Sequence, residues 1–143
     1  MRARLALACL ATVGIADCMI LRRTPRWHAI ALFDHPAHVA TAALIGGTGR
    51  TYLAGSLLPD VDHIPMAFRS PEPGDPRPKT HSLYAVLPVA LVSRPLAAGM
   101  LAHFARDLAL HPGVPLFGGR PFRVPYAAYA VLLLATAYSR SRP

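Results

Sequence analysis

The chain of 143 residues has few charged residues, few aromatic residues and almost no cysteine. Only 15% of its residues are charged and 53% are apolar, whereas an average globular protein has about 25% charged residues. This composition excludes an intrinsically disordered chain and supplies enough apolar residues for the core of one domain. Cys9 and Cys18 are nine positions apart, so they lie on opposite faces of a helix, and no CxxC pair exists. The sequence therefore offers no disulfide between them, no zinc knuckle and no dithiol redox pair.

Acidic residues are also scarce, with 7 Asp and Glu against 15 Lys and Arg, which gives a formal net charge of +8. A nucleic-acid-binding protein usually gathers its basic residues into a stripe and stacks bases on aromatic side chains. Here the basic residues are scattered between apolar segments, and aromatic residues make up 8% of the chain. Binding of a specific nucleic acid is therefore disfavoured, and we attribute the basicity to segments that flank membrane helices.

Four apolar segments of helical length predict an all-α fold. They are Leu5–Leu21, Val39–Leu58, Leu83–Phe104 and Val124–Tyr138. A bilayer core requires about 20 apolar residues per helix, so each segment is a marginal membrane span and could instead be a core helix. A simple four-span arrangement also places similar numbers of basic residues on both sides, which gives no preferred orientation.

The first apolar segment begins after two arginines and is either a signal peptide or an uncleaved helix. Asp17-Cys18 stands where a cleavage site requires small residues, so we expect an uncleaved helix. We accordingly divide the chain into an N-terminal apolar helix with a basic linker, residues 1–33, and a helical domain, residues 34–143.

Several of the few carboxylates stand beside histidines, most clearly in Leu57–His63, which reads LLPDVDH. Pro59 is expected to end a helix, so that Asp60, Asp62 and His63 turn outward within reach of one cation. Mixed carboxylate and imidazole ligands suit zinc, manganese or iron. The alternative is an acidic loop that is solvated or caps the helix.

A second group of polar residues flanks the segment Leu83–Phe104. His81 precedes it, within a Thr-His-Ser sequence that can cap a helix, and His103 and Asp107 share one helical face at i, i+4 spacing. A straight helix would separate His81 from His103 by about 33 Å. A break at residues 93–95, Ser-Arg-Pro, forms a hairpin that brings them to the same end. A neutral histidine hydrogen-bonded to an aspartate is the other interpretation of the i, i+4 pair.

The same reasoning applies to His38 and Asp60, which are 22 residues apart with a glycine-rich break at residues 46–50 between them. His38 is expected at the entrance of the second helix, and Asp34 is expected to cap it. With both breaks, the polar groups lie on one face of a small helical bundle. Its apolar helices, membrane-embedded or membrane-associated, would be broken into hairpins.

Taken in order, these motifs resemble the YdjM-type inner-membrane metal-dependent hydrolases, a family that is similar to zinc-dependent phospholipase C. The matching residues are His38, LLPDVDH at 57–63, THSL at 80–83, GMLAHFARD at 99–107 and GVPL at 113–116. The resemblance covers about residues 34 to 138 and depends on the order and combination of the motifs.

The resemblance implies a helical fold and hydrolysis of an ester or phosphoester by a metal-activated water. The cofactor would be a divalent metal, zinc first, with two or three ions, and manganese second. Its implied ligands are His38, Asp60, Asp62, His63, His81, His103 and Asp107. Among them, Asp60, Asp62 and His81 are the candidates for a catalytic role.

Arg77 and Lys79 lie in the basic loop before His81 and would suit an anionic small-molecule or lipid substrate, although the loop can equally be a solvated connection. Apolar helices and basic flanks favour membrane lipids as partners and the bacterial inner or plasma membrane as the location. The main alternative is a non-catalytic helical membrane protein with a structural metal site, because a closed and an open metal site can use the same residues.

Overall fold

The computed structural model describes residues 3–22, 27–63, 80–110, 113–115 and 121–142, and the fold over these residues is all-helical, as predicted. The helices are α1 (Ala3–Arg22), α2 (Trp27–Gly46), α3 (Arg50–Gly55), the 3-10 helix η1 (Leu58–His63), α5 (Leu83–Val92), α6 (Arg94–Leu110) and α7 (Tyr126–Ser141). Between α6 and α7, an antiparallel bridge joins Val114 to Phe122.

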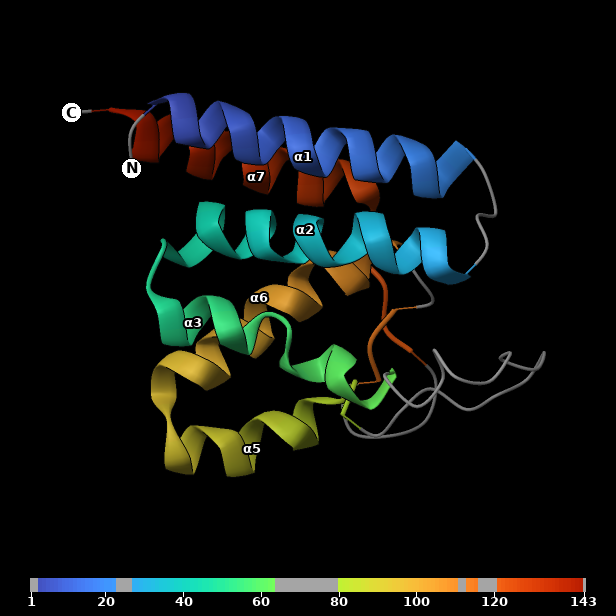
Figure 1. The fold of residues 1–143 in the computed structure, drawn as a ribbon, viewed down its shortest axis with the longest axis vertical. Coiled ribbons are helices and arrows are strands. Elements are labelled where there is room, and N and C mark those ends of the chain that lie inside the picture. The colour runs from blue at the N-terminus through green and yellow to red at the C-terminus, as the bar shows by residue number, and fades with distance from the viewer. Residues whose placement is uncertain (1–2, 23–26, 64–79, 111–112, 116–120, 143) are drawn as a thin grey trace.

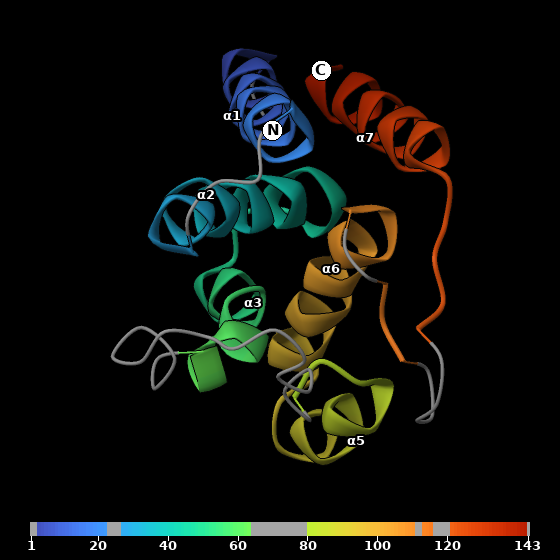
Figure 2. The same cartoon turned by 90° about the vertical axis from the view of Figure 1, so that its right-hand side faces the viewer.

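The helices form layers stacked along the long axis of the molecule (Figure 1). Helices α1 and α7 lie side by side at one end and α2 lies below them, with α3 further along the axis. Helix α6 runs from beside α2 to α5 at the opposite end (Figure 2). Because α6 contacts α2, α3, α5 and α7, it links both ends of the bundle.

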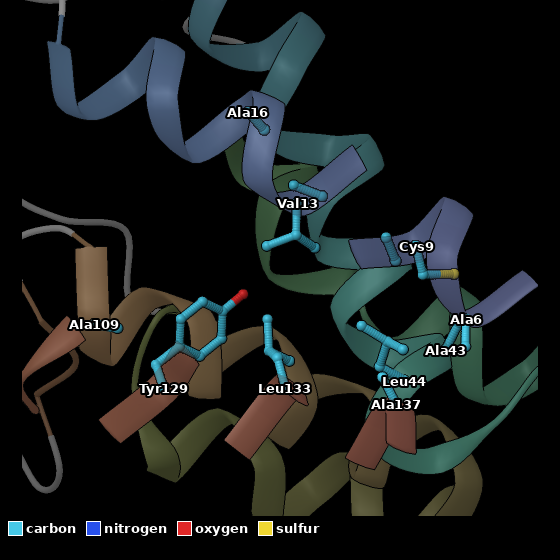
Figure 3. Packing of buried hydrophobic residues seen from close by; sticks show 12 residues of the cluster. Ala6, Cys9, Val13, Ala16, Ala43, Leu44, Ala109, Tyr129, Leu133 and Ala137 are labelled. Atoms are coloured by element: carbon cyan, nitrogen blue, oxygen red, sulfur yellow. The ribbon is translucent and has the colours of Figure 1, made fainter. Parts of the chain in front are cut away.

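The larger hydrophobic core lies where α1, α2 and α7 meet (Figure 3). Helix α1 buries Ala6, Cys9, Val13 and Ala16, whose spacing of three or four residues gives one apolar stripe. Val13 points toward Leu133 of α7. This core combines residues from before and after the expected domain boundary at residues 33 and 34, and the boundary itself lies inside α2.

Both predicted breaks are present, and each produces two helices that pack against one another. Helices α5 and α6 are separated at Ser93. Helices α2 and α3 are separated by residues 47–49, where Gly47 has a φ of 101° that a side chain would disfavour. The break at Ser93 turns the chain back from the end of α5 toward α2, as the predicted hairpin requires.

Two local predictions were wrong. Helix α2 begins at Trp27 and continues through Pro36, so Asp34 and His38 lie within the helix and not at its start. A proline removes one helical hydrogen bond, and the packing of α2 between α1 and α6 outweighs that loss. The helix before the LLPDVDH motif ends at Gly55, and Pro59 is buried within η1, so Asp60 turns inward rather than outward.

Two glycines let α3 and α6 approach closely. A Cβ atom at Gly99 would overlap the carbonyl oxygen of Tyr52 and lie 2.9 Å from the Cα atom of Gly55. A Cβ atom at Gly55 would in turn overlap the carbonyl oxygen of Leu96. The close approach places the C-terminal end of α3 directly against the middle of α6, one turn before His103.

Among the described residues, Ala3–Leu21 of α1 is the one stretch long and apolar enough to cross a bilayer. A buried core helix or an N-terminal signal sequence would satisfy the same criterion. Leu7, Ile15 and Leu21 of this helix are exposed, as are Leu91 and Val92 of α5. Apolar surface of this extent is typical of proteins that contact a membrane or a partner, which gives weak support to the expected membrane location.

Candidate metal centre

Four separate segments bring five of the predicted ligands together. His38 comes from α2, Asp60 from η1, His81 from the turn before α5, and His103 and Asp107 from α6. His103 and Asp107 do share one helical face, with Nε2 and Oδ2 3.5 Å apart. We call these five residues the histidine cluster.

Asp60 and Asp107 lie between the imidazole rings of the histidine cluster. Asp60 Oδ1 is 3.3 Å from His81 Nε2 and 3.7 Å from His103 Nε2. Asp107 Oδ2 is 3.8 Å from His81 Nε2, and its Oδ1 is 3.5 Å from His38 Nε2. Two sets of three residues have their ligand atoms within 4.8 Å of one another, and His103 belongs to both. These sets are His38, Asp60 and His103, and His81, His103 and Asp107.

The separations suit ligands around a cation better than direct hydrogen bonds. An N–H···O hydrogen bond is normally about 2.7–3.2 Å long, and the contacts within the cluster are 3.3–3.8 Å. Two ligands of a tetrahedral zinc ion at about 2.1 Å would lie about 3.4 Å apart. The donor set therefore fits a divalent metal in both atom type and spacing.

The tautomer of His103 is fixed by the backbone at the end of α3. His103 Nδ1 lies 2.8 Å from the carbonyl oxygen of Ser56, which can only accept a hydrogen bond, so Nδ1 carries the proton. In the neutral ring, Nε2 then presents its lone pair to the two carboxylates. Among the described residues, this buried Nε2 has no hydrogen-bond partner. Orientation of a ligating histidine by a carbonyl group is a common arrangement in metal sites.

His38 and His103 are stacked, with ring centroids 3.7 Å apart and the planes inclined by 9°. Burial lowers the pKa of His38, and the neighbouring His103 lowers it further. Burial also opposes protonation of His103, but the carboxylates of Asp107 and Asp60 raise its pKa. Two stacked imidazolium ions would repel one another at this distance, so the pair favours at least one neutral ring with a free lone pair.

His35, to which the sequence pattern assigned no role, extends the cluster toward solvent. Its ring is 46% exposed, and its Nε2 lies 3.3 Å from Asp60 Oδ2. Asp60 raises the pKa of His35. Burial works against ionisation of Asp60, yet the adjacent imidazole rings of His35 and His81 hold its pKa well below the usual range. His35 thus forms the rim of the site.

A second buried polar group, which sequence reasoning missed, lies behind the histidine cluster. Arg106 is fully buried and pairs with Asp17 of α1 and with Asp34 of α2, whose Oδ1 is 2.9 Å from Nη2. Tyr126 donates a 2.8 Å hydrogen bond to Asp17, and Arg106 donates to the Tyr129 hydroxyl. We call these five residues the arginine network. Asp17 lies in the middle of an apolar segment, and this position was the sequence signal for the arginine network.

Asp34 connects the two groups. Its Oδ2 is 3.5 Å from His38 Nε2, while its Oδ1 accepts a 3.0 Å hydrogen bond from Arg106 Nε. Although burial opposes ionisation, His38 and Arg106 hold the pKa of Asp34 well below the usual range. Asp34 thus favours its charged form between His38 and Arg106, and the expectation that it caps a helix was wrong.

Some predicted site residues lie outside the described residues. They are the side chains of Asp62 and His63, together with Arg77 and Lys79. Their predicted roles as ligands and substrate-binding residues therefore stay predictions. Ser82 occupies the N-cap position of α5 without a side-chain capping hydrogen bond, and His81 lies in the turn before the helix.

No family model, curated protein or solved structure matches the chain. The resemblance to the YdjM-type hydrolases therefore stays a prediction, and the functional argument is based on the site itself.

Proposed function

We propose that the chain is a membrane-associated, metal-dependent hydrolase of the YdjM type that cleaves an ester or phosphoester. The observation that supports this proposal is the convergence of His38, Asp60, His81, His103 and Asp107 from four segments. Their atoms have the spacing of metal ligands, and the inward-facing Nε2 of His103 has no hydrogen-bond partner among the described residues. In the neutral ring this Nε2 can ligate a cation, because the Ser56 carbonyl holds the ring proton on Nδ1.

Each residue has a task in the proposed site. The three histidines and two aspartates would hold a divalent cation, with zinc favoured by the mixed nitrogen and oxygen ligands and manganese as the second choice. Such a cation supplies Lewis acidity toward an ester or phosphoester oxygen and acidifies water near neutral pH. The Ser56 carbonyl orients His103, and Asp34 orients His38.

His35 is proposed to move protons at the rim. Its ring is accessible to solvent on one side, and its Nε2 contacts Asp60 on the other. It can therefore donate a proton to a leaving oxygen and recover it from water, as a general acid must.

The first test is elemental analysis of the purified protein, with His103→Gln and His35→Gln compared with the wild type. We expect bound zinc or manganese in the wild type and in His35→Gln, and its loss in His103→Gln. A metal-free wild type that takes up neither ion would refute the metal site.

The second test is hydrolysis of chromogenic nitrophenyl esters and phosphate mono- and diesters by the same three proteins. The proposal predicts metal-dependent turnover by the wild type, none by His103→Gln, and a lowered kcat for His35→Gln at full metal content. Bound metal without turnover of any ester class would instead support the alternative of a structural metal site in a non-catalytic membrane protein.

A further inference from the structure

An apolar groove of about 520 Å³ lies between α1, α2 and α3, beside the histidine cluster. Its walls include Leu5 and Cys9 of α1, Val39 and Ala43 of α2, and Leu53 of α3. Apart from two threonines and one histidine, every lining residue is apolar. The volume is within the range of about 300–1,000 Å³ that is usual for small-molecule sites.

The groove has one histidine in its wall, and that side chain leads to the histidine cluster. His35 is part of the lining, and its Nε2 lies 3.3 Å from Asp60 Oδ2. The other oxygen of Asp60 is 3.3 Å from His81 Nε2. A molecule that lies in the groove with a polar end at His35 would therefore place that end next to the proposed metal ligands.

The two faces of α2 explain this arrangement. Asp34 and His38 face α6 and belong to the polar groups described above. Val39 and Ala43 lie on another side of the same helix and line the groove. The small alanine side chain leaves space along α2, whereas a larger residue would fill it.

Helix α1 indicates where an occupant would come from. Leu5 and Cys9 of this helix line the groove, while Leu7, Ile15 and Leu21 are exposed on its surface. It is also the described helix that is long and apolar enough to cross a bilayer. One wall of the groove thus belongs to the element best suited to contact lipid, which favours a membrane lipid over an amphiphile dissolved in water.

We propose that the groove binds an acyl chain of a membrane lipid and presents the ester or phosphoester of its head group to the histidine cluster. The inference rests on the proposed function, because it names the substrate class of that same site. An apolar body with one polar end matches a groove whose walls are mostly apolar and whose one histidine, His35, contacts Asp60.

The test is photo-crosslinking of the zinc-loaded protein in nanodiscs that contain phosphatidylglycerol with a diazirine in one acyl chain. Mass spectrometry then locates the lipid adducts. We expect adducts at Ala43 and Leu53 in the wild type, in addition to adducts on the exposed side of α1. Adducts confined to Leu7, Ile15 and Leu21 would show that lipid only surrounds the protein, and would overturn the proposal.

Two substitutions distinguish occupancy of the groove from general lipid contact. Thr12→Trp places an indole ring in the groove from α1, and Ile15→Trp places the same ring on its exposed side. We expect Thr12→Trp to abolish the adducts at Ala43 and Leu53, and Ile15→Trp to retain them. Thr48→Trp, at an exposed lining position outside the helices, should act like Thr12→Trp and provides a second variant if the first fails to fold. Equal adducts in all variants would overturn the proposal.

Metal content measured on the same samples separates this inference from the proposed function. Bound zinc with no lipid adduct in the groove would refute the acyl-chain site alone. Absence of zinc from the wild type would refute the proposed hydrolase even if adducts form. A dimeric wild type that becomes monomeric in Thr12→Trp, with no lipid adducts in the groove, would instead assign the groove to a second copy and contradict the lipid proposal.

Discussion

The arginine network and the histidine cluster lie next to one another on α2 and α6, yet they satisfy their polar groups in different ways. In the network, Arg106 donates hydrogen bonds from Nη1 to Asp17 and from Nε to Asp34, and two tyrosines complete the arrangement, while Nη2 has only the ion-pair contact with Asp34. In the cluster, imidazole nitrogens face carboxylates at 3.3–3.8 Å, and His103 Nε2 has no partner among the described residues.

The comparison indicates that the arginine network stabilises the fold, whereas the histidine cluster is suited to bind a cation. A buried charge that is paired and hydrogen-bonded is complete within the fold, and its removal leaves uncompensated partners. A buried set of metal-ligand atoms that lacks a hydrogen-bond partner, as at His103 Nε2, is completed by a cation. We therefore expect the network to determine stability under all conditions, and the cluster to contribute to stability mainly when metal is present.

The largest effect should come from Arg106→Met, which leaves Asp17 and Asp34 buried without their counter-ion. We expect a loss of about 3–5 kcal/mol in the free energy of unfolding, measured by urea denaturation of the metal-free protein. Arg94→Met is the control, because Arg94 is exposed at the start of the same helix. If Arg106→Met does not fold, Asp17→Asn gives a milder variant. A loss below about 1 kcal/mol would mean that the network stabilises the fold no more than an exposed surface ion pair does.

The second effect tests whether the cluster depends on metal. Zinc at about 100 times its dissociation constant should raise the free energy of unfolding of the wild type by about 2.7 kcal/mol, and should leave His103→Gln unchanged. Without metal, His103→Gln should cost less than Arg106→Met, which thermal unfolding of both variants can check. If the metal-free His103→Gln protein is destabilised as much as Arg106→Met, the cluster is a structural network and the comparison is wrong.

The sequence predicted the cluster better than the network because different signals reveal them. His103 and Asp107 have local i, i+4 spacing, and the Ser93 break follows from a serine, an arginine and a proline in an apolar segment. These local signals were enough to predict that His81 and His103 meet. The partners of Arg106 lie on α1, α2 and α7, and such long-range pairing is not encoded in spacing.

The errors in the predicted helix boundaries have a similar cause. Local preference predicted that Pro59 ends a helix and that the second helix begins at His38, but tertiary packing holds Pro59 inside η1 and His38 inside α2. Asp34 was assigned to capping for the same reason. Local propensity is a weak guide where a segment is packed on several sides, as α2 is by α1, α3, α6 and α7.

The third prediction concerns the contact between α3 and α6 that orients His103. Gly99→Ala would drive a Cβ atom into the Tyr52 carbonyl, so we expect a loss of about 1–3 kcal/mol in the free energy of unfolding. The displaced Ser56 carbonyl should also weaken zinc binding in a metal titration. Gly14→Ala is the matched control, because nothing lies within 4 Å of that site and alanine favours a helix. Unchanged zinc affinity in a folded Gly99→Ala protein would show that Ser56 does not orient His103.

The smallest expected effect is a change in the pH dependence of stability when Tyr126 of the arginine network is replaced. Burial and the hydrogen bond to Asp17 raise the pKa of Tyr126 above its ordinary value of 10.0, and Arg106 opposes this shift. A raised pKa in the folded state means that the contribution of Tyr126 is complete below about pH 10 and is lost as the pH rises through the higher folded value. We expect Tyr126→Phe to lower stability at neutral pH and to flatten the alkaline decline measured by thermal unfolding. Burial also raises the pKa of Tyr129, so part of the slope should remain.

Zinc affinity of Tyr126→Phe should not change, because Tyr126 contacts Asp17 of the arginine network. A change in zinc affinity would show that the arginine network and the histidine cluster act as one unit.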